Sequence, residues 1–215
     1  MPLLILDRDG VINEDSDNFI RSLADWRPIP GSLDAIARLS RGGFDIAIAT
    51  NQSGLARGLF DVTILDDMHF RLQQLVMEQG GRVDLIVHCP HGPDDGCDCR
   101  KPRTGLLTRY LAETAIDLDN SAVIGDRQSD VELAERLGVA PECGLAGNGS
   151  NEMIALVFAA FAGAAGARAA DAGVHDDAVH PRPQVRPLRE GVERSVRLEE
   201  RLLEHVLGVG RPPGE

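Results

Sequence analysis

The sequence has little positive charge and no long apolar run. Its 215 residues include 22 Lys and Arg against 34 Asp and Glu, which gives a formal net charge of -12 at pH 7. Nucleic acid is therefore not an expected partner, because a phosphate backbone requires a basic protein face. No apolar run comes near the roughly 20 residues that span a bilayer, so a membrane is not an expected partner either.

Targeting signals and cysteines are also scarce. The start, Met1-Pro2-Leu3, has no basic segment and leads directly into an apolar stretch, so we expect no signal peptide and a cytoplasmic location. The sequence has four cysteines, and three of them lie within eleven residues. In a reducing compartment this crowding predicts a metal site rather than disulfides.

Strands and helices are predicted to alternate over the first two-thirds of the chain. Apolar runs and helical spacing predict strands at 3–6, 45–49, 83–88 and 122–124, and helices at 32–41, 64–79, 104–114 and 129–137. The pattern Ser129-x-x-Glu132 is interpreted as a capping box that begins the last helix. This alternation predicts an α/β fold with a parallel sheet covered by helices on both faces.

The character of the chain changes after about residue 150. Residues 155–172 are largely Ala and Gly, and residues 180–187 are rich in proline. Ordering costs about 1.5 kcal/mol per residue, which so few large apolar groups do not offset. We therefore expect one domain at 1–158 and a weakly packed or disordered extension at 159–215. A partner-binding arm, or a segment unrelated to the core, remains an alternative for the extension.

Two carboxylates one residue apart follow the first predicted strand. Asp7 and Asp9 come directly after the apolar run 3–6, and Gly10 lets the backbone turn away. Ligands of open α/β sheets bind beyond the carboxyl ends of the strands, so both acids are expected in the site. One carboxylate can attack an electrophile while the other transfers a proton. Taken alone, the motif could also be an acidic turn or a cation-binding loop.

Three further polar motifs follow in order along the chain. Thr50 comes after the apolar run 46–49, Arg100 and Lys101 are adjacent cations, and Asp126 comes after the run 122–124. Taken singly, Thr50 could be an ordinary residue at the end of a strand. Arg100 and Lys101 could be a solvated surface pair, and Asp126 could be part of an ordinary turn. The order Asp-x-Asp, Thr, Lys and Asp resembles the motifs of the haloacid dehalogenase superfamily of phosphohydrolases.

A cysteine-rich loop precedes the two cations. Cys89, His91, Cys97 and Cys99 offer three thiolates and an imidazole, a set typical of structural zinc with four protein ligands. Zinc would fix the loop that carries the cations, and would not itself take part in the reaction. Free cysteines are the alternative interpretation. Carboxylates suit zinc less well beside thiolates, and the loop contains three of them, Asp94, Asp95 and Asp98.

Residues 1 to about 140 closely resemble the small histidinol-phosphate and heptose-bisphosphate phosphatases of the haloacid dehalogenase superfamily. Both share the pattern Cys-Pro-His…Cys-x-Cys-Arg-Lys-Pro, which is present here at 89–102. Segments 7–18 and 50–58 resemble the D-glycero-D-manno-heptose 1,7-bisphosphate 7-phosphatases, whereas 123–134 is closer to the histidinol type. The resemblance implies a three-layer, doubly wound, Rossmann-like parallel sheet. The short spacing between Asp9 and Thr50 leaves no room for a large cap domain.

The resemblance also implies a magnesium-dependent mechanism through an aspartyl-phosphate. Asp7 would attack phosphorus, and Asp9 would protonate the leaving group and then activate water. Thr50 and Lys101 would bind the phosphoryl oxygens. The residues implied to hold Mg²⁺ are Asp7, Asp9 through its carbonyl, and Asp126.

Further residues are implied to contact a small phosphorylated substrate. Asp130 is expected to orient Arg127 or a metal-bound water, and no role is predicted for His69. The candidate substrate contacts are Asp15, Ser16, Asp17, Asn18, Asn51, Gln52, Ser53, Arg100 and Arg127.

The expected reaction is removal of the 7-phosphate of D-glycero-D-manno-heptose 1,7-bisphosphate by a monomer. Histidinol-phosphate phosphatase of histidine biosynthesis is the nearest alternative. A non-catalytic, metal-stabilised binding module is disfavoured because the full set of catalytic acids is present. A nucleic-acid end phosphatase is disfavoured by the acidic balance of the chain.

Overall fold

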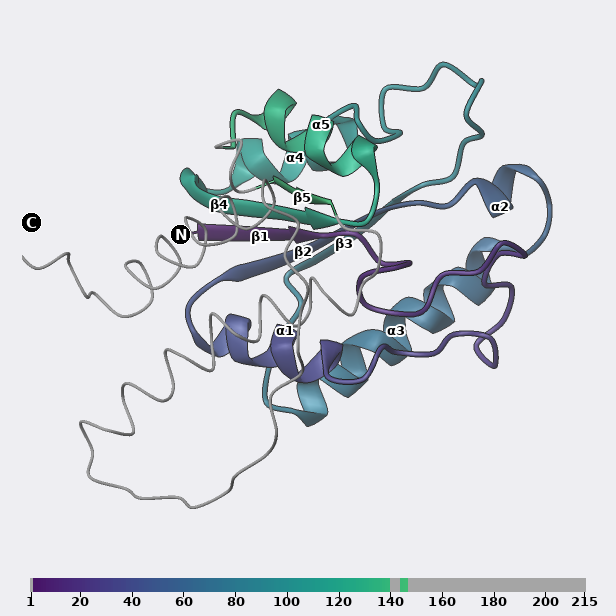
Figure 1. Ribbon diagram of the computed structural model, residues 1–215, viewed down its shortest axis with the longest axis horizontal. Helices are drawn as coiled ribbons and strands as arrows, with labels where there is room; N and C mark the ends of the chain where they lie inside the picture. The colour runs from purple at the N-terminus through teal and green to yellow at the C-terminus, as the bar shows by residue number, and fades with distance from the viewer. Residues whose placement is uncertain (1, 140–143, 147–215) are drawn as a thin grey trace, which may run out of the picture. The chain divides into compact units, whose positions relative to one another are not determined.

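Figure 1 shows the protein as a computed structural model, which describes residues 2–139 and 144–146. Strands and helices alternate along it. The elements are β1 (Pro2–Leu6), α1 (Ser32–Arg41), β2 (Asp45–Asn51), α2 (Ser53–Ala56), α3 (Val62–Glu78), β3 (Leu85–Cys89), α4 (Gly105–Glu113), β4 (Asp117–Gly125), α5 (Gln128–Leu137) and β5 (Gly144–Ala146).

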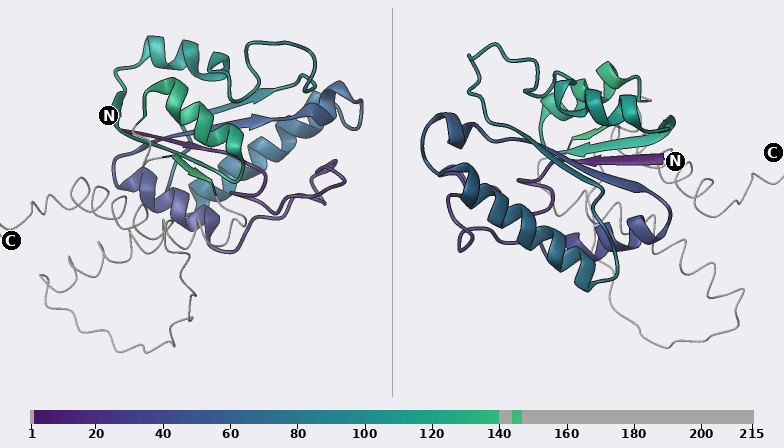
Figure 2. Two further views of the ribbon diagram at one scale, coloured as in Figure 1. Left: turned by 45° about the horizontal axis from the view of Figure 1, so that its top comes forward. Right: turned by 180° about the vertical axis from the view of Figure 1, so that it is seen from behind.

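The strands form one parallel sheet in the order β3-β2-β1-β4-β5. α1 and α3 cover one face, and α4 and α5 cover the other, as the views of Figures 1 and 2 agree. The predicted three-layer, doubly wound sheet is therefore confirmed. The chain winds outward from β1 to β3, and then crosses back to β4 on the other side of β1. This change of direction creates a topological switch point between β1 and β4.

The core lies on both faces of the central strands. β1 is apolar at every side chain from Leu3 to Leu6, and each of these is at most 4% exposed, as expected for a strand covered on both sides. α3 buries one face through Leu65, Met68, Leu72 and Val76, all 0% exposed. Each such side chain stabilises the fold by about 1.5–3 kcal/mol.

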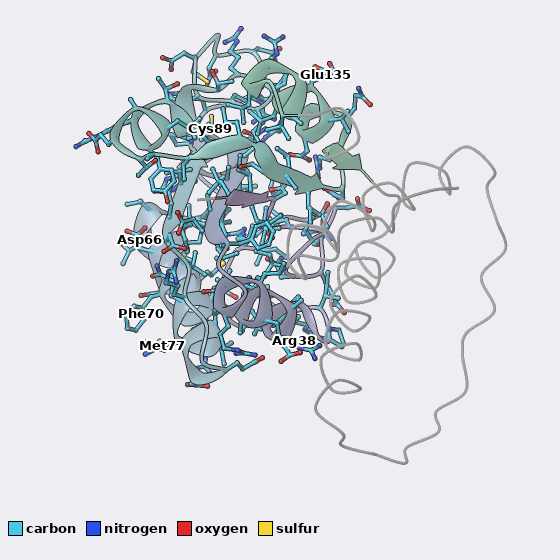
Figure 3. The ribbon with its side chains drawn as sticks, turned by 90° about the vertical axis from the view of Figure 1, so that its left-hand side faces the viewer. Arg38, Asp66, Phe70, Met77, Cys89 and Glu135 are labelled. Carbon is cyan, nitrogen blue, oxygen red and sulfur yellow. The ribbon has the colours of Figure 1, made fainter. Side chains whose placement is uncertain are left out.

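The opposite face of α3 is directed to solvent. Phe70 and Met77 are 61% and 67% exposed, and Figure 3 shows them on the outer side of the helix. The helix begins where the Asp61 carboxylate accepts a hydrogen bond from the Ile64 N–H at 3.0 Å. The helical periodicity predicted here was therefore correct, although α3 begins two residues before the predicted start.

The predicted capping box at Ser129 and Glu132 is wrong. α5 begins at Gln128, so Ser129 lies inside its first turn. Asp130 instead reaches back, and its carboxylate accepts a hydrogen bond from the Arg127 N–H at 3.2 Å. The helix ends at Gly138, whose φ of 74° is the left-handed conformation that glycine adopts without strain.

Other differences from the sequence-based prediction concern short or polar segments. β4 extends back to Asp117, through polar residues that gave no apolar run. α2 and β5, of four and three residues, are too short to show a periodicity. Within the described segments, no helix is both long and apolar enough to cross a membrane. The predicted boundary at residue 158 and the extension beyond it lie outside the described residues.

Candidate active site

The predicted catalytic residues meet at the carboxyl ends of β1, β2 and β4. Leu6 pairs with Ile48 of β2 and with Ile124 of β4, so these three strands end at nearly the same level. Asp7 continues the ladder, because its N–H donates to the Ile124 carbonyl at 2.9 Å. The site therefore lies at the switch point, where the sheet leaves space for a ligand.

A buried lysine joins two carboxylates at the centre of this site. Lys101 Nζ lies 3.0 Å from Asp7 Oδ2 and 2.6 Å from Asp130 Oδ1, and all three residues are at most 7% exposed. Burial would lower the pKa of Lys101, but the two carboxylates outweigh it and raise the pKa. Lys101 is thus held as a cation beside Asp7.

The environment also raises the pKa of Asp7, which for a carboxyl group disfavours the charged form. Burial raises its pKa to about 6, against the opposing charge of Lys101, and the nearby Asp130 and Asp9 carboxylates raise it further. A carboxylate here is less well solvated than in water. The Asp7 Oδ1 atom is also oriented, because it accepts the Arg8 N–H at 2.7 Å.

Asp7, Asp126 and Asp130 form a cluster that could hold a metal ion, with one oxygen of each within 4.8 Å of the others. Asp126 Oδ1 is buried and has no hydrogen-bond partner within the described part of the chain. Such an orphan oxygen fits a hard cation such as Mg²⁺, which prefers carboxylate ligands.

Two glycines allow the carboxylates to approach. A Cβ at Gly10 would lie 2.3 Å from Asp126 Oδ2, and a Cβ at Gly125 would lie 2.1 Å from Asp130 Cγ. Gly10 also has a φ of 83°, which side-chain-bearing residues rarely adopt. Both glycines are therefore part of how the acidic cluster is built.

Asp9 is surrounded by hydrogen-bond donors. Arg8 Nε and Nη2 donate to its two oxygens at 2.9 Å each, and Asn13 Nδ2 and Gln52 Nε2 donate at 2.9 and 2.8 Å. Burial alone would raise the pKa of Asp9, but the Arg8 charge and these hydrogen bonds outweigh it and lower the pKa. The carboxylate is held in one orientation.

The segment after β2 connects the site to the neighbouring loop. Thr50 is 1% exposed, and its Oγ1 accepts from Gln52 Nε2 at 2.9 Å. Asn51 Oδ1 accepts the Lys101 N–H at 3.0 Å, and Asn51 Nδ2 donates to the Lys101 carbonyl at 3.3 Å. Both amide atoms of Asn51 thus hold the backbone of the lysine.

The four predicted zinc ligands converge. Sγ of Cys89 lies 3.7 Å from Sγ of Cys97 and 3.4 Å from Sγ of Cys99, and His91 Nδ1 lies 3.2 Å from Cys99 Sγ. A tetrahedron with Zn–S bonds of about 2.3 Å has edges of roughly 3.8 Å. The donor set and its spacing therefore fit a closed zinc site.

The remaining predicted residues lie on the 15–18 loop or next in sequence to residues of the site. Asp15, Ser16, Asp17 and Asn18 are exposed, and Asp15 Oδ2 pairs with Arg127 Nη2 at 2.9 Å although they are 112 residues apart. Arg100 Nη1 donates to the His91 carbonyl at 3.3 Å, so this guanidinium is directed to the cysteine loop. Ser53 is the first residue of α2. The structure thus joins Arg127 to the 15–18 loop.

Sequence reasoning missed the contacts of Arg8 and His69, and the pairing of Asp130 with Lys101. Arg8 is 0% exposed, and Nη1 lies 3.4 Å from Nε2 of His69, itself 8% exposed. An arginine that stands between two acidic residues in the sequence is expected to be exposed to solvent. No feature of the sequence places His69 near Arg8. Asp130 had a usable signal, because it lies four residues after Asp126.

His69 is expected to make the protein sensitive to acid. Burial lowers its pKa from 6.5 to about 3, with further lowering by Arg8 and His88 and an opposing effect of Asp9. The unfolded state then binds more protons than the folded state, so stability is full above about pH 6.5 and falls toward pH 3. At pH 5 the cost is about 2 kcal/mol.

Urea unfolding at pH 8 and pH 5 tests this effect. The wild type should lose about 2 kcal/mol more between these pH values than His69→Gln, which has no titrating ring. The same pH dependence in both proteins would show that His69 is protonated as readily in the folded state as in the unfolded one.

A doubly wound sheet with paired aspartates at its switch point, followed by threonine, lysine and aspartate at neighbouring positions, defines a phosphohydrolase of the haloacid dehalogenase type. Residues 98–155 match the HAD-hydrolase-like family. The chain is 56% identical over 139 residues to D-glycero-beta-D-manno-heptose-1,7-bisphosphate 7-phosphatase of Pseudomonas aeruginosa, covering 65% of this chain and 78% of the relative.

A solved structure gives the same match. D,D-heptose 1,7-bisphosphate phosphatase from B. bronchiseptica, complexed with magnesium and phosphate, is 48% identical with a TM-score of 0.62, over 65% of this chain and 78% of that one. The histidine biosynthesis bifunctional protein HisB of Blochmanniella floridana is 40% identical over 139 residues, which are 64% of this chain and 39% of that protein. The chain belongs to the heptose-1,7-bisphosphate 7-phosphatase family of haloacid dehalogenase-like hydrolases.

Proposed function

We propose that this phosphatase removes the 7-phosphate of D-glycero-β-D-manno-heptose 1,7-bisphosphate through an aspartyl-phosphate on Asp7. The observation that carries this proposal is the convergence of Asp7, Asp9 and Lys101 at the switch point, in a chain 56% identical to a heptose phosphatase. The relatives of the histidinol type are less similar, which favours the heptose substrate.

Asp7 is the proposed nucleophile. Its Oδ1 is held by the Arg8 N–H and its Oδ2 by Lys101, so the carboxylate has a fixed direction of attack. An Asp7 oxygen forms a bond to phosphorus as the bond from phosphorus to the sugar oxygen breaks. Lys101 and Thr50 then stabilise the charge on the phosphoryl oxygens, which is the larger part of catalysis in phosphoryl transfer.

Asp9 is the proposed proton donor and acceptor. It lies two residues after the nucleophile, on the same turn, with its carboxylate held by donors on both oxygens. In the first step Asp9 acts in its carboxylic acid form, gives its proton to the departing alkoxide and becomes the carboxylate. In the second it takes a proton from the water that attacks the aspartyl-phosphate, and this returns both residues to their initial state.

Magnesium is the proposed cofactor of this reaction. The residues that would hold it are Asp7, the Asp9 carbonyl and Asp126, and the buried Asp126 Oδ1, which has no hydrogen-bond partner among the described residues, fits this assignment. When bound, Mg²⁺ neutralises charge between the anionic nucleophile and the anionic phosphate. Asp130 orients Lys101, and the Asp15–Arg127 pair offers polar groups to the sugar.

A zinc ion is the proposed cofactor of the cysteine loop. Cys97→Ser should remove zinc and lower kcat/KM by about 10–100-fold, since the loop leads directly to Arg100 and Lys101. Metal analysis beside steady-state kinetics tests this, with Cys143→Ser, which lies outside the 89–99 segment of the sequence, as the control. Protein purified without chelator that contains no zinc would contradict the assignment. Thiol ligands also require reducing conditions, which supports a cytoplasmic location.

A substrate comparison tests the proposed function. The wild type should hydrolyse heptose 1,7-bisphosphate with a kcat/KM at least about 10²-fold above that for histidinol phosphate, because a site built for sugar hydroxyls rejects a ligand that lacks them. Phosphorus NMR should show loss of the 7-phosphate and retention of the 1-phosphate. Asp7→Asn purified in the same way controls for contaminating phosphatases. The reverse preference would overturn the heptose assignment.

A further inference from the structure

We propose that Arg8, supported from behind by His69, is a positioning residue that holds the Asp9 carboxylate in the orientation needed for proton transfer. This inference rests on the proposed function, because it assigns how the proton donor of that reaction is held. Neither Arg8 nor His69 was expected to take part from the sequence.

The guanidinium of Arg8 binds the Asp9 carboxylate through two parallel hydrogen bonds. Nε donates to Oδ1 and Nη2 to Oδ2, each at 2.9 Å, which is the bidentate geometry that fixes a carboxylate plane most firmly. Arg8 is 0% exposed, whereas the Asp9 side chain is 19% exposed. The arginine therefore approaches Asp9 from the protein interior and leaves its outer side to the substrate.

Backbone geometry makes this pairing of adjacent residues possible. Successive side chains of a strand point to opposite faces, but the chain has already left β1 at Arg8. The Arg8 carbonyl accepts the N–H groups of Ile12 at 2.8 Å and Asn13 at 3.2 Å, and Gly10 N–H donates to the Asn13 carbonyl at 2.8 Å. This closed turn holds the backbone on both sides of the arginine–aspartate pair.

One of the neutral donors to Asp9 can be released at low cost. A carboxylate has about four lone-pair positions, and four donors occupy them here. Gln52 Nε2 also donates to Thr50 Oγ1 at 2.9 Å, so it keeps a partner when it leaves Asp9 Oδ2. The other neutral donor, Asn13 Nδ2, likewise has a second acceptor in the Glu14 carbonyl at 2.9 Å. Neutral hydrogen bonds are weaker than charged ones, so an oxygen of Asp9 can exchange the proton while the Arg8 fork stays in place.

His69 contacts Nη1, the guanidinium nitrogen of Arg8 that does not bind Asp9. Arginine has only donors, so Nε2 of His69 must accept from Nη1 in the 3.4 Å contact and the ring must be neutral. The ring is confined between α3 and β3, where its centroid lies 5.9 Å from that of His88. Because the contact is long, its loss should have a smaller effect than loss of the fork itself.

Two pairs of variants separate positioning from charge and from folding. Arg8→Lys keeps the charge and loses the fork, while Arg8→Met loses both. Gln at position 69 places an acceptor where Nε2 lies, and Asn, which has the same amide, is too short to reach it. His69→Gln and His69→Asn therefore share the same amide and differ by one methylene group, which decides whether the contact under test can form.

The measured quantity is kcat/KM for two leaving groups, heptose 1,7-bisphosphate and p-nitrophenyl phosphate. This constant reports the steps up to release of the alcohol, and only the alkoxide needs a well-placed proton donor. Arg8→Lys should lower it by about 10–100-fold for the sugar and less than about threefold for the aryl ester. His69→Asn should cost about threefold to tenfold for the sugar only, and His69→Gln should restore most of this.

Several results would overturn the inference. If folded Arg8→Lys lost kcat/KM equally on both substrates, Arg8 would have a general structural role. If the variant kept full activity, Arg8 would have no role in the reaction. His69→Gln as impaired as His69→Asn would exclude the acceptor role of His69. Thermal unfolding of each variant identifies misfolding, and the His69 pair decides the matter if the Arg8 variants do not fold. Wild-type protein that hydrolyses glycerol phosphate but not the heptose would overturn only the proposed substrate, and the comparison then uses glycerol phosphate.

Discussion

Asp7→Asn should lower kcat by more than about 10⁴-fold while the protein stays folded, since removal of a nucleophile has the largest effects in covalent catalysis. An amide has nearly the shape of the carboxylate, but it is a poor nucleophile. In the wild type, Asp7 is aligned by the Arg8 N–H at 2.7 Å and by Lys101 at 3.0 Å. Steady-state turnover and acid-quench trapping of phosphorylated protein measure the loss.

The control for Asp7→Asn is the same substitution outside the site. Asp84→Asn changes a carboxylate that accepts from the Ile46 N–H and from Arg82 at the other end of the sheet, and its turnover should equal that of the wild type. Asp7→Asn that keeps more than about a hundredth of the activity would contradict covalent catalysis, since loss of acid–base assistance alone costs about 10²–10⁴-fold.

Lys101→Met should reduce both stability and rate. Lys101 is the cation between Asp7 and Asp130, and all three are almost fully buried. Removal of one partner from a buried ionic cluster costs about 3–5 kcal/mol because the remaining charges are unpaired. The rate should fall by about 10²–10³-fold, since one cation no longer stabilises the phosphoryl group.

Urea unfolding at pH 7 without divalent cations measures the stability of Lys101→Met. Arg100→Met is the matched control for stability, because the side chain of the neighbouring Arg100 donates to a backbone carbonyl, that of His91 at 3.3 Å, and is half-buried. It should cost less than about 1 kcal/mol. A Lys101→Met protein as stable as Arg100→Met would mean that the carboxylates find other partners.

Residues directly after strands could be placed from the sequence. Asp7, Thr50 and Asp126 each follow an apolar run, and parallel strands bring such ends to one edge of a sheet. The role of Lys101 could be assigned only through the resemblance of the chain to known phosphatases. The loop that carries Lys101 has no regular structure from which its position could be predicted. The four candidate metal ligands of the cysteine loop were recognisable because their chemistry and spacing are unusual.

No local sequence pattern predicted the contacts between residues that lie far apart in the chain. Asn51 was predicted as a substrate contact, and the structure adds that both of its amide atoms hold the backbone of Lys101, fifty residues away. The pairing of Asp130 with Lys101, and of Arg8 with His69, depends on how α5 and α3 pack on the sheet. The capping box was misassigned for a related reason, because Asp130 satisfies the helix start and the lysine at once.

The sequence by itself determined the order of the longer strands and helices, the parallel sheet and the identity of the chemical groups. These follow from local rules, since apolar periodicity selects each element and the covalent order of the motifs selects the class of enzyme. Only the tertiary structure decided which charges neutralise one another. Burial makes each charged group depend on the partner that the fold brings to it, and for Arg8, Asp9 and Lys101 those partners come from several elements that are distant in the chain.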